Sequence, residues 1–137
     1  MTQSSIKAFL LEDAQALEET KEINFPQFAD PFVIRSLAAD EFDAITKRAT
    51  KRIKQNGTYA QEVDQNKLVD EMVAGAVVTP DLNDAELQEF YGTIGNAAGT
   101  ARKMLKAGQW GNLLSDIQEL SGFEQESIDD LVEEVKK

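Results

Sequence analysis

The chain of 137 residues contains neither cysteine nor histidine. Without cysteine it has no disulfide framework and no thiolate site, a composition that suits a reducing compartment. Without histidine it lacks the usual general base near neutral pH and the commonest metal ligand. The chain therefore lacks two of the side chains most used in catalysis, and we assign no catalytic residue, no metal site and no cofactor.

Long apolar runs are also missing. No stretch approaches the roughly 18 residues that a membrane-spanning helix needs. The first 15 residues, MTQSSIKAFLLEDAQ, lack the basic region and the long apolar region of a secretory signal. We therefore expect the protein to remain in the compartment where it is made.

Positive charge is scarce. The chain has 25 acidic and 14 basic residues, and its net charge is -11. Such a surface repels phosphate backbones and anionic lipids, so we expect neither nucleic acid nor a membrane as a partner. A high net charge also favours solubility, which suits a protein that presents apolar surface to other proteins.

The length and the 42% hydrophobic content predict one domain, residues 1–137, that buries a core without stabilising disulfides or metal ions. We predict a mainly α (α+β) fold: a compact bundle of about five or six short helices with a small N-terminal β-hairpin. Residues 1–38 form the segment with the hairpin, and residues 39–137 form the helical core. The two antiparallel strands lie within residues 18–37, around a loop at residues 26–31.

An isolated hairpin is only marginally stable in water. The predicted hairpin must therefore lie on the helices, or its edge must add to the sheet of a neighbouring molecule. The second option makes it a candidate interaction edge.

The stretch from residue 67 to residue 92 has the most apolar helical pattern. Its apolar residues form one side of a helix with 3.6 residues per turn. They are Leu68, Val69, Met72, Val73, Ala76 and Val77. Gly75 interrupts this helix at some cost in stability, so we expect another backbone to come close there. Thr79-Pro80 is predicted to end the helix.

Another helix is predicted to begin almost at once. Asn83 is the expected N-cap, and Glu86 can complete a capping box with it. Leu82 and Leu87 occupy the two positions of a hydrophobic staple.

A helix of about four turns is predicted from Asp40, as its cap, to Gln55, where Asn56-Gly57 stops it. Its core side consists of Phe42, Ile45, Ala49 and Ile53. Its other side is basic and consists of Lys47, Arg48, Lys51, Arg52 and Lys54. This face is either simply solvated, or it docks an acidic partner or the acidic C-terminus of another copy in an oligomer.

Four further segments complete the prediction. Residues 4–17 form a short helix with Ile6, Phe9, Leu10 and Leu17 on its apolar side. Residues 58–63 form a connector with Tyr59 as an anchor, and Asp64 caps the central helix. Asn96 caps a helix that ends near Gly108, and the next helix carries Trp110, Leu113, Leu114, Ile117 and Leu120 and ends at Gly122. The last helix presents Ile128, Leu131, Val132 and Val135 on one side.

Seven residues are candidates for partner binding: Trp110, Ile128, Leu131, Val132, Val135, Lys47 and Lys51. For the apolar ones the alternative is a place in the core, because aromatic and aliphatic side chains on a regular stripe usually pack inward. A calcium loop starting at Asp81 fails, since Glu86 stands where glycine is required. The glycines at 92, 95 and 99 match neither nucleotide-binding pattern.

Several motifs together resemble the XkdN-like tail assembly chaperones of phages and prophages of Gram-positive bacteria. Their pattern P-x-L-N-D-x-E-L-Q-x-x-Y-G is carried by Pro80, Leu82, Asn83, Asp84, Glu86, Leu87, Gln88, Tyr91 and Gly92. It is followed by Lys103, Met104, Leu105, Gly108, Trp110, Leu113 and Leu114, and then by Ser121, Gly122 and Phe123 before an acidic end. The resemblance covers roughly residues 32 to 137. The chain departs from it at residues 96–99, where the family has acidic and leucine residues.

The resemblance implies a non-enzymatic protein of the host bacterial cytoplasm that is absent from the mature virion. It implies two partners: the tape measure protein, which it keeps soluble, and the tail tube protein, whose assembly it assists. A longer form made by ribosomal frameshifting is a further partner in this family, and Lys136-Lys137 are compatible with a slippery codon pair or with ordinary helix-end charges. A homo-oligomer is another candidate assembly. The alternative function is a structural tail or baseplate component that is retained in the virion.

Overall fold

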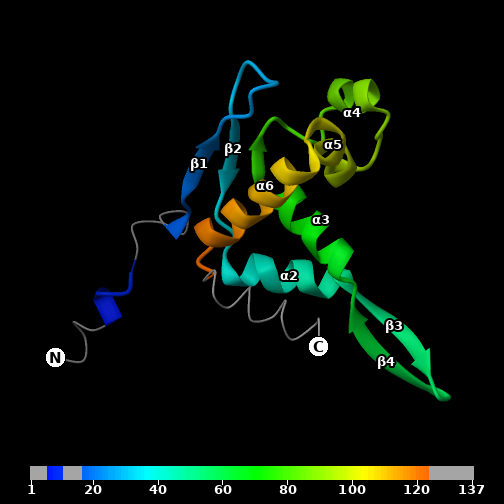
Figure 1. Cartoon of the computed structure of the whole chain (residues 1–137). Helices are drawn as coiled ribbons and strands as arrows, with labels where there is room; N and C mark the ends of the chain where they lie inside the picture. The colour runs from blue at the N-terminus through cyan, green and yellow to red at the C-terminus, as the bar shows by residue number, and fades with distance from the viewer. Residues whose placement is uncertain (1–5, 11–16, 124–137) are drawn as a thin grey trace.

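The computed structural model describes residues 6–10 and 17–123 (Figure 1). A three-stranded antiparallel sheet lies at one side, with the strand order β1-β2-β5. β1 spans Thr20–Ile23, β2 spans Phe32–Arg35 and β5 spans Val77–Thr79. β2 is the central strand, so a strand that follows it by about forty residues in the sequence completes the sheet.

Five helices lie beside this sheet in the described part of the chain. They are α2 (Ala39–Ala49), α3 (Gln65–Ala76), α4 (Ala85–Tyr91), α5 (Ala97–Met104) and α6 (Ala107–Leu120). α6 contacts β1 and β2 on one side and α3 on the other, while α2 packs across α3. α4 and α5 form a smaller pair beyond the end of β5 (Figure 1). The predicted α+β class, with short helices and an N-terminal hairpin, is confirmed.

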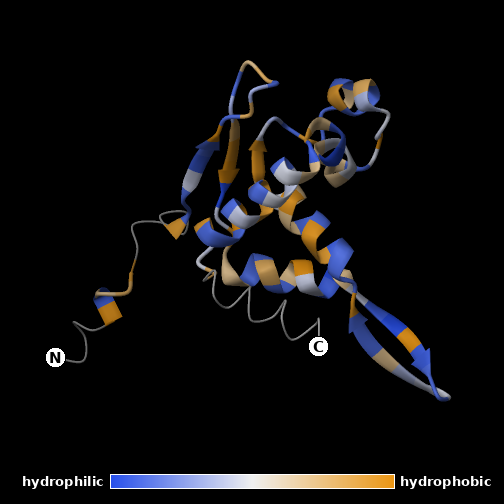
Figure 2. Ribbon diagram, viewed as in Figure 1, coloured by the Kyte–Doolittle hydropathy of each residue, from blue (hydrophilic) through white to orange (hydrophobic). Residues whose placement is uncertain are grey.

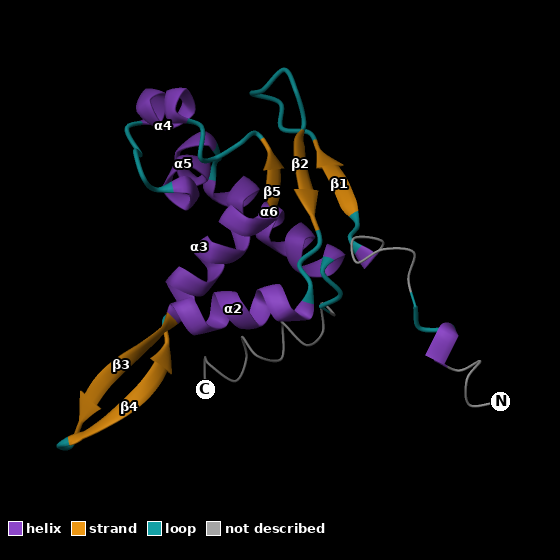
Figure 3. Cartoon of the chain, turned by 180° about the vertical axis from the view of Figure 1, so that it is seen from behind, coloured by secondary structure: helices purple, strands orange, loops and turns teal. Residues whose placement is uncertain are grey.

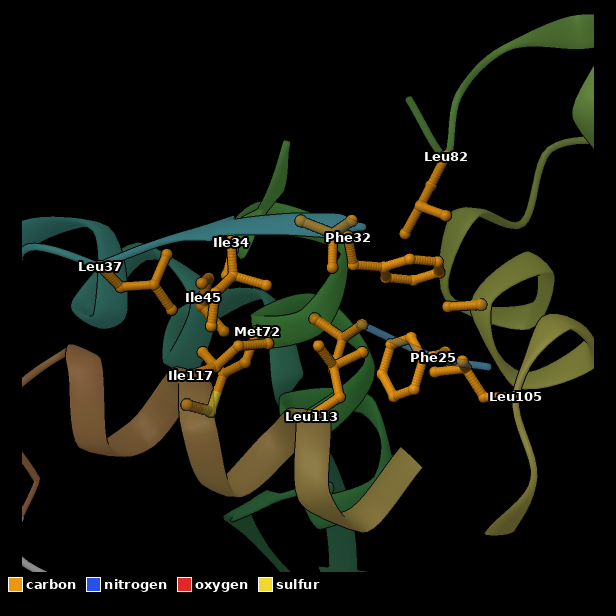
Figure 4. Close-up of a cluster of buried hydrophobic side chains, with 14 residues drawn as sticks. Phe25, Phe32, Ile34, Leu37, Ile45, Met72, Leu82, Leu105, Leu113 and Ile117 are labelled. Atoms are coloured by element: carbon orange, nitrogen blue, oxygen red, sulfur yellow. The ribbon is translucent and has the colours of Figure 1, made fainter. Parts of the chain in front are cut away.

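The core lies where β2 meets α3 and α6. Side chains alternate along a strand, and on β2 Phe32 and Ile34 are buried while the residues between and after them are half-buried. Figure 4 shows these two side chains among those of Met72 from α3 and Leu113 and Ile117 from α6. Burial of each such side chain contributes roughly 1.5 to 3 kcal/mol.

The predicted helix from Asp40 to Gln55 is wrong in its second half. α2 ends at Ala49, and Thr50–Gln55 forms strand β3, which pairs with β4 at Thr58–Val63. Asn56 and Gly57 have φ values of 53° and 82°, which suit the two-residue turn that most often joins antiparallel strands. The Asn-Gly pair therefore makes a hairpin turn instead of stopping a helix.

This second hairpin also corrects the interpretation of residues 58–63 as a connector. Tyr59 is not an anchor, because 63% of it is exposed. The basic residues are likewise divided between two elements: Lys47 lies on α2 and Lys51 on β3, and both are exposed.

Two of the predicted helix caps are confirmed. Asp64 accepts a hydrogen bond from the Lys67 N–H at 3.2 Å, and Asn96 accepts one from the Gly99 N–H at 2.8 Å. Asn83 is not a cap. Asp84 caps α4 instead and accepts from the Leu87 N–H at 3.0 Å. The cap lies one residue later than predicted, because the chain makes a turn between residues 81 and 84 before the helix begins.

The start of one other helix and the end of another also differ from the prediction. α2 begins after Ala38, so Asp40 lies in the first turn, and the Glu41 carboxylate accepts from the Ala38 N–H at 3.1 Å. α3 ends at Ala76, before Thr79-Pro80, because Val77–Thr79 pairs with β2. Sheet pairing thus ends this helix three residues before the proline pair.

The segments predicted as the first and last helices lie mainly outside the described residues. Of the predicted helix at residues 4–17, the described part includes Ile6, Phe9, Leu10 and Leu17, all of them exposed. The predicted stripe of Ile128, Leu131, Val132 and Val135 lies wholly outside the described residues.

Gly75 does not mark a close approach of another backbone. A methyl group built there meets only two side-chain atoms, Leu37 Cδ2 at 3.8 Å and Ile45 Cδ1 at 3.9 Å, which are ordinary van der Waals distances. The position therefore has room for a side chain within a regular helix.

We expect Gly75→Ala to raise the free energy of unfolding by about 0.5 to 1 kcal/mol, because alanine restricts the unfolded chain and favours the helix. Urea denaturation measures the change. Gly92→Ala is the matched control: Gly92 has φ of 68°, so the same substitution there lowers stability. A destabilised Gly75→Ala variant would contradict this account of the packing.

Candidate functional site

The β3–β4 hairpin, residues 50–63, projects away from the helices (Figures 1 and 3). We call it the arm. Its strands pair over six residues each, from Thr50 opposite Val63 to Gln55 opposite Thr58. The Asp64 N–H donates to the Ala49 carbonyl at 2.8 Å and closes the base of the arm where α2 ends and α3 begins. The arm is thus fixed at its base and exposed along its length.

The two faces of the arm follow from the strand alternation. Arg52, Lys54 and Tyr59 share one face, and the Arg52 guanidinium lies 4.2 Å from the centre of the Tyr59 ring. Lys51 and Ile53 lie on the other face. Figure 2 shows that most of the arm is hydrophilic. One face therefore combines cations with an aromatic ring, a composition that is common where proteins bind one another.

Positive charge is concentrated at the arm and its base. Residues 47–54 contain five of the 14 basic residues and no acidic one, so nine basic residues remain against 25 acidic residues elsewhere. Arg48 pairs with Glu71 at 3.0 Å. Within the described ranges, Lys47, Lys51, Arg52 and Lys54 form no ion pair. These four charges are available to an acidic partner.

A second candidate surface lies at the end of α4. Phe90 is 80% exposed and Ile94, in the following loop, is 77% exposed. The Phe90 ring packs edge-to-face on the half-buried Tyr91 ring, with 4.9 Å between centroids. We call these three residues the α4 patch, and Glu86 and Glu89 on the same helix are exposed with it.

Buried polar contacts hold the loop that carries Ile94. The Gln88 amide is buried, donates to the Leu82 carbonyl at 2.8 Å and accepts from the Gly95 N–H at 3.0 Å. The Thr93 and Thr100 hydroxyl groups bond to each other at 2.5 Å. Because Gln88 faces inward, Phe90 must point outward from the same short helix. This surface was not predicted from the sequence, because neighbouring apolar residues such as Phe90 and Tyr91 can both face a core, as Met72 and Val73 do on α3.

Trp110 takes part in the packing of three helices. It is half-buried against the core, and the Arg102 guanidinium lies 4.1 Å from the centre of its ring. Arg102 also pairs with Asp70 at 2.7 Å, so α3, α5 and α6 meet here. The structure gives Trp110 a packing role, and its part in partner binding stays a prediction.

A concave region of about 720 Å³ lies between residues 17–19, which precede β1, the connection from β2 to the start of α2, and the end of α6. Arg35 pairs there with Glu18 at 3.2 Å and with both oxygens of Glu41. The hydrogen bonds from Arg35 lower the pKa of Glu41, against the opposing effect of burial. Glu41 is therefore held as a charged ion-pair partner, unlike a general acid, whose pKa is raised.

The described ranges contain no group of three or more acidic side chains arranged to hold a metal ion. None of their helices is both long enough and apolar enough to cross a membrane.

Comparison with known proteins gives one family and two relatives. The family model described as phage XkdN-like tail assembly chaperone matches residues 6–136. XkdN of the phage-like element PBSX of Bacillus subtilis (strain 168) is 26% identical over 129 residues, which cover 86% of each chain. The uncharacterized protein YqbN of the same strain is also 26% identical over 129 residues, with 86% of this chain and 85% of YqbN covered.

A crystal structure of YqbN has a similar fold. Its TM-score is 0.65 at 20% sequence identity, and the match covers 84% of this chain and 99% of that one.

We expect Glu41→Gln to lower the free energy of unfolding by about 1 kcal/mol at neutral pH, because the amide cannot form the ion pair with Arg35. Folding lowers the pKa of Glu41 from its ordinary value of 4.5, so the ion pair stabilises the protein fully above that pH. This stabilisation is lost as the pH falls through the lower pKa of the folded state. Urea denaturation at several pH values measures the difference between the two proteins.

Glu22→Gln is the control, since Glu22 is exposed on β1 and forms no ion pair among the described residues. Its effect is expected to stay below about 0.5 kcal/mol at every pH. If the Glu41→Gln difference were the same at acidic and at neutral pH, the ion pair would not be its cause.

Proposed function

Because the chain belongs to the XkdN-like family of phage tail assembly chaperones, we propose that it binds the tape measure protein while the phage tail is built. In this role it keeps the tape measure protein soluble and assists the assembly of tail tube protein around it. The family match over residues 6–136 carries the proposal, and it confirms the resemblance that the sequence motifs gave.

The α4 patch supports binding to an apolar helix. A tape measure protein that is not yet enclosed by the tube exposes apolar helical surface, which must be covered to prevent aggregation. Burial of a Phe or Ile side chain contributes roughly 1.5 to 3 kcal/mol. Phe90 and Ile94 thus contribute apolar contacts to binding, and a patch of this size leaves the complex reversible.

The small area of the α4 patch also accounts for release of the tape measure protein. When tube protein covers the tape measure protein with a larger apolar area, it displaces a chaperone that binds through a small patch. The net charge of -11 keeps the complex soluble until then. The protein would accordingly act in the host bacterial cytoplasm and be absent from the mature virion.

The proposed mechanism is binding and not catalysis. The concave region near the start of α2 contains an Arg35–Glu41 ion pair whose lowered carboxyl pKa favours a fixed charge over proton transfer. The α4 patch is exposed and the arm projects from the helices, so both offer contact area. Both features suit a protein that works by association.

A structural component retained in the virion is the alternative function. The outer edge of β1 favours it, because this strand pairs only with β2 among the described residues and could add to the sheet of a neighbour. Mass spectrometry of purified virions separates the two functions. The chaperone is expected to be absent, and one copy or more per particle would establish the alternative.

We expect the double variant Phe90→Ser, Ile94→Ser to lose most of its ability to keep co-expressed tape measure protein soluble. Both side chains are exposed, so the stability of the variant itself is expected to change by less than about 0.5 kcal/mol. The soluble fraction of tape measure protein after co-expression measures the effect, and thermal unfolding checks the fold.

Phe9→Ser is the matched control, because Phe9 is 82% exposed but lies outside the α4 patch. It is expected to support solubility as the unchanged chain does. Tape measure protein that is equally soluble with the double variant would exclude the α4 patch as the binding surface. Tape measure protein that is equally insoluble with and without the unchanged chain would contradict the proposed function itself.

A further inference from the structure

The arm has an excess of positive charge, and among residues 6–10 and 17–123 no strand pairs with the outer edge of either of its strands. Its Lys51, Arg52 and Lys54 oppose a single acidic residue, Glu62 on β4. A two-stranded hairpin is only marginally stable in water, so the arm is stabilised when another surface covers it. Like charges disfavour pairing between two arms. The surface that covers the arm must therefore be acidic.

An acidic edge of that kind exists on the same chain, along β1. The pairing of this strand with β2 continues to Glu19, whose carbonyl accepts from the Ser36 N–H at 2.7 Å. In the part of the chain that the structure describes, the outer edge of β1 has no partner strand. Backbone donors and acceptors on this edge are open to an added strand.

Acidic side chains lie on both faces of this edge. By strand alternation, Glu22 lies on one face and Glu19 on the other. Glu18, which precedes the strand, is already paired with Arg35 at 3.2 Å. α6 adds the exposed Glu119 and the half-buried Asp116, which pairs with Lys21 at 3.4 Å. The arm has the complementary arrangement, with Arg52 and Lys54 on one face and Lys51 on the other. Opposite charges can therefore meet on both faces if the arm lies along β1.

The arm cannot reach β1 of its own chain. In Figures 1 and 3 it projects from the junction of α2 and α3, whereas β1 forms the far edge of the sheet at the opposite side of the protein. Contact between the two surfaces therefore requires two copies.

We propose that the arm of one copy docks along the β1 edge of a second copy. The donor and acceptor surfaces differ, so the contact is head-to-tail, and a dimer retains a free edge on one copy and a free arm on the other. Association then continues beyond a dimer, into a ring or an open chain. This assembly requires no client protein, so its test is independent of the proposed chaperone function.

Sedimentation velocity of the full chain at low and high salt provides the first test. We expect concentration-dependent association at low ionic strength. It should weaken at about 0.5 M salt, where charges are screened over only a few ångströms. A chain that stays monomeric at low salt at every accessible concentration overturns the proposal.

Two charge-reversed variants give the second test. Lys51→Glu, Lys54→Glu removes the arm as a donor, and Glu19→Lys, Glu22→Lys removes the edge as an acceptor. All four side chains are exposed, and thermal unfolding checks that both proteins fold. Each variant alone is expected to associate at least about tenfold more weakly than the unchanged chain, because like charges then face each other.

A mixture of the two variants distinguishes this geometry from general electrostatic attraction. The unchanged arm of the edge variant can dock on the unchanged edge of the arm variant, and the two reversed surfaces also carry opposite charges. The mixture is therefore expected to recover the association that each variant alone loses, and a mixture that associates as weakly as either variant alone overturns the proposal. Lys103→Glu, Lys106→Glu is the matched control, since it changes the same charge at exposed positions away from the arm. It is expected to associate as the unchanged chain does, and equal weakening in this control overturns the proposal.

The acidic C-terminal residues are the competing acceptor. The variant Asp129→Asn, Asp130→Asn, Glu133→Gln, Glu134→Gln neutralises them in the full chain. Association that survives these changes supports docking on β1. Association that is lost here but survives in the edge variant shows that the arm binds the C-terminal residues, and it overturns docking on β1.

Discussion

The packing of β2 between its two neighbouring strands and against α3 and α6 is the contact on which the rest of the structure depends. Phe32 and Ile34 on β2 meet Leu113 and Ile117 on α6, and all four are almost fully buried. Because β2 is central, this one strand positions β1 and β5, and β5 in turn ends α3. The position of the acidic β1 edge is therefore a consequence of core packing.

Two of the surfaces proposed for binding, the arm and the α4 patch, lie outside this core. The arm is attached only where α2 ends and α3 begins, and the α4 patch lies on a short helix whose inward side is provided by Gln88 and Leu87. The exposed side chains of Tyr59, Phe90 and Ile94 contribute little to folding, and we attribute their exposure to binding. An acidic body with a basic arm and an apolar patch offers distinct contacts to copies of itself and to a client.

Much of the fold could be predicted from the sequence, because the decisive signals are local. Asp64 and Asn96 act as caps through hydrogen bonds to residues three positions away. The arm was missed because the basic stretch fits a helical period, whereas the left-handed conformations of Asn56 and Gly57 pair it with the strand that follows. The α4 patch was missed because a helical pattern does not reveal which of two neighbouring aromatic residues a core will accept.

The sequence by itself determined the α+β class, the first hairpin, the family, and the total charge, since each of these depends on residue types and short spacings. Tertiary structure alone decided where the charge is exposed, which strand completes the sheet, and which apolar residues stay outside. These outcomes depend on contacts between segments far apart in the chain. Val77 pairs with Ile34 across more than forty residues, and no local pattern encodes that choice.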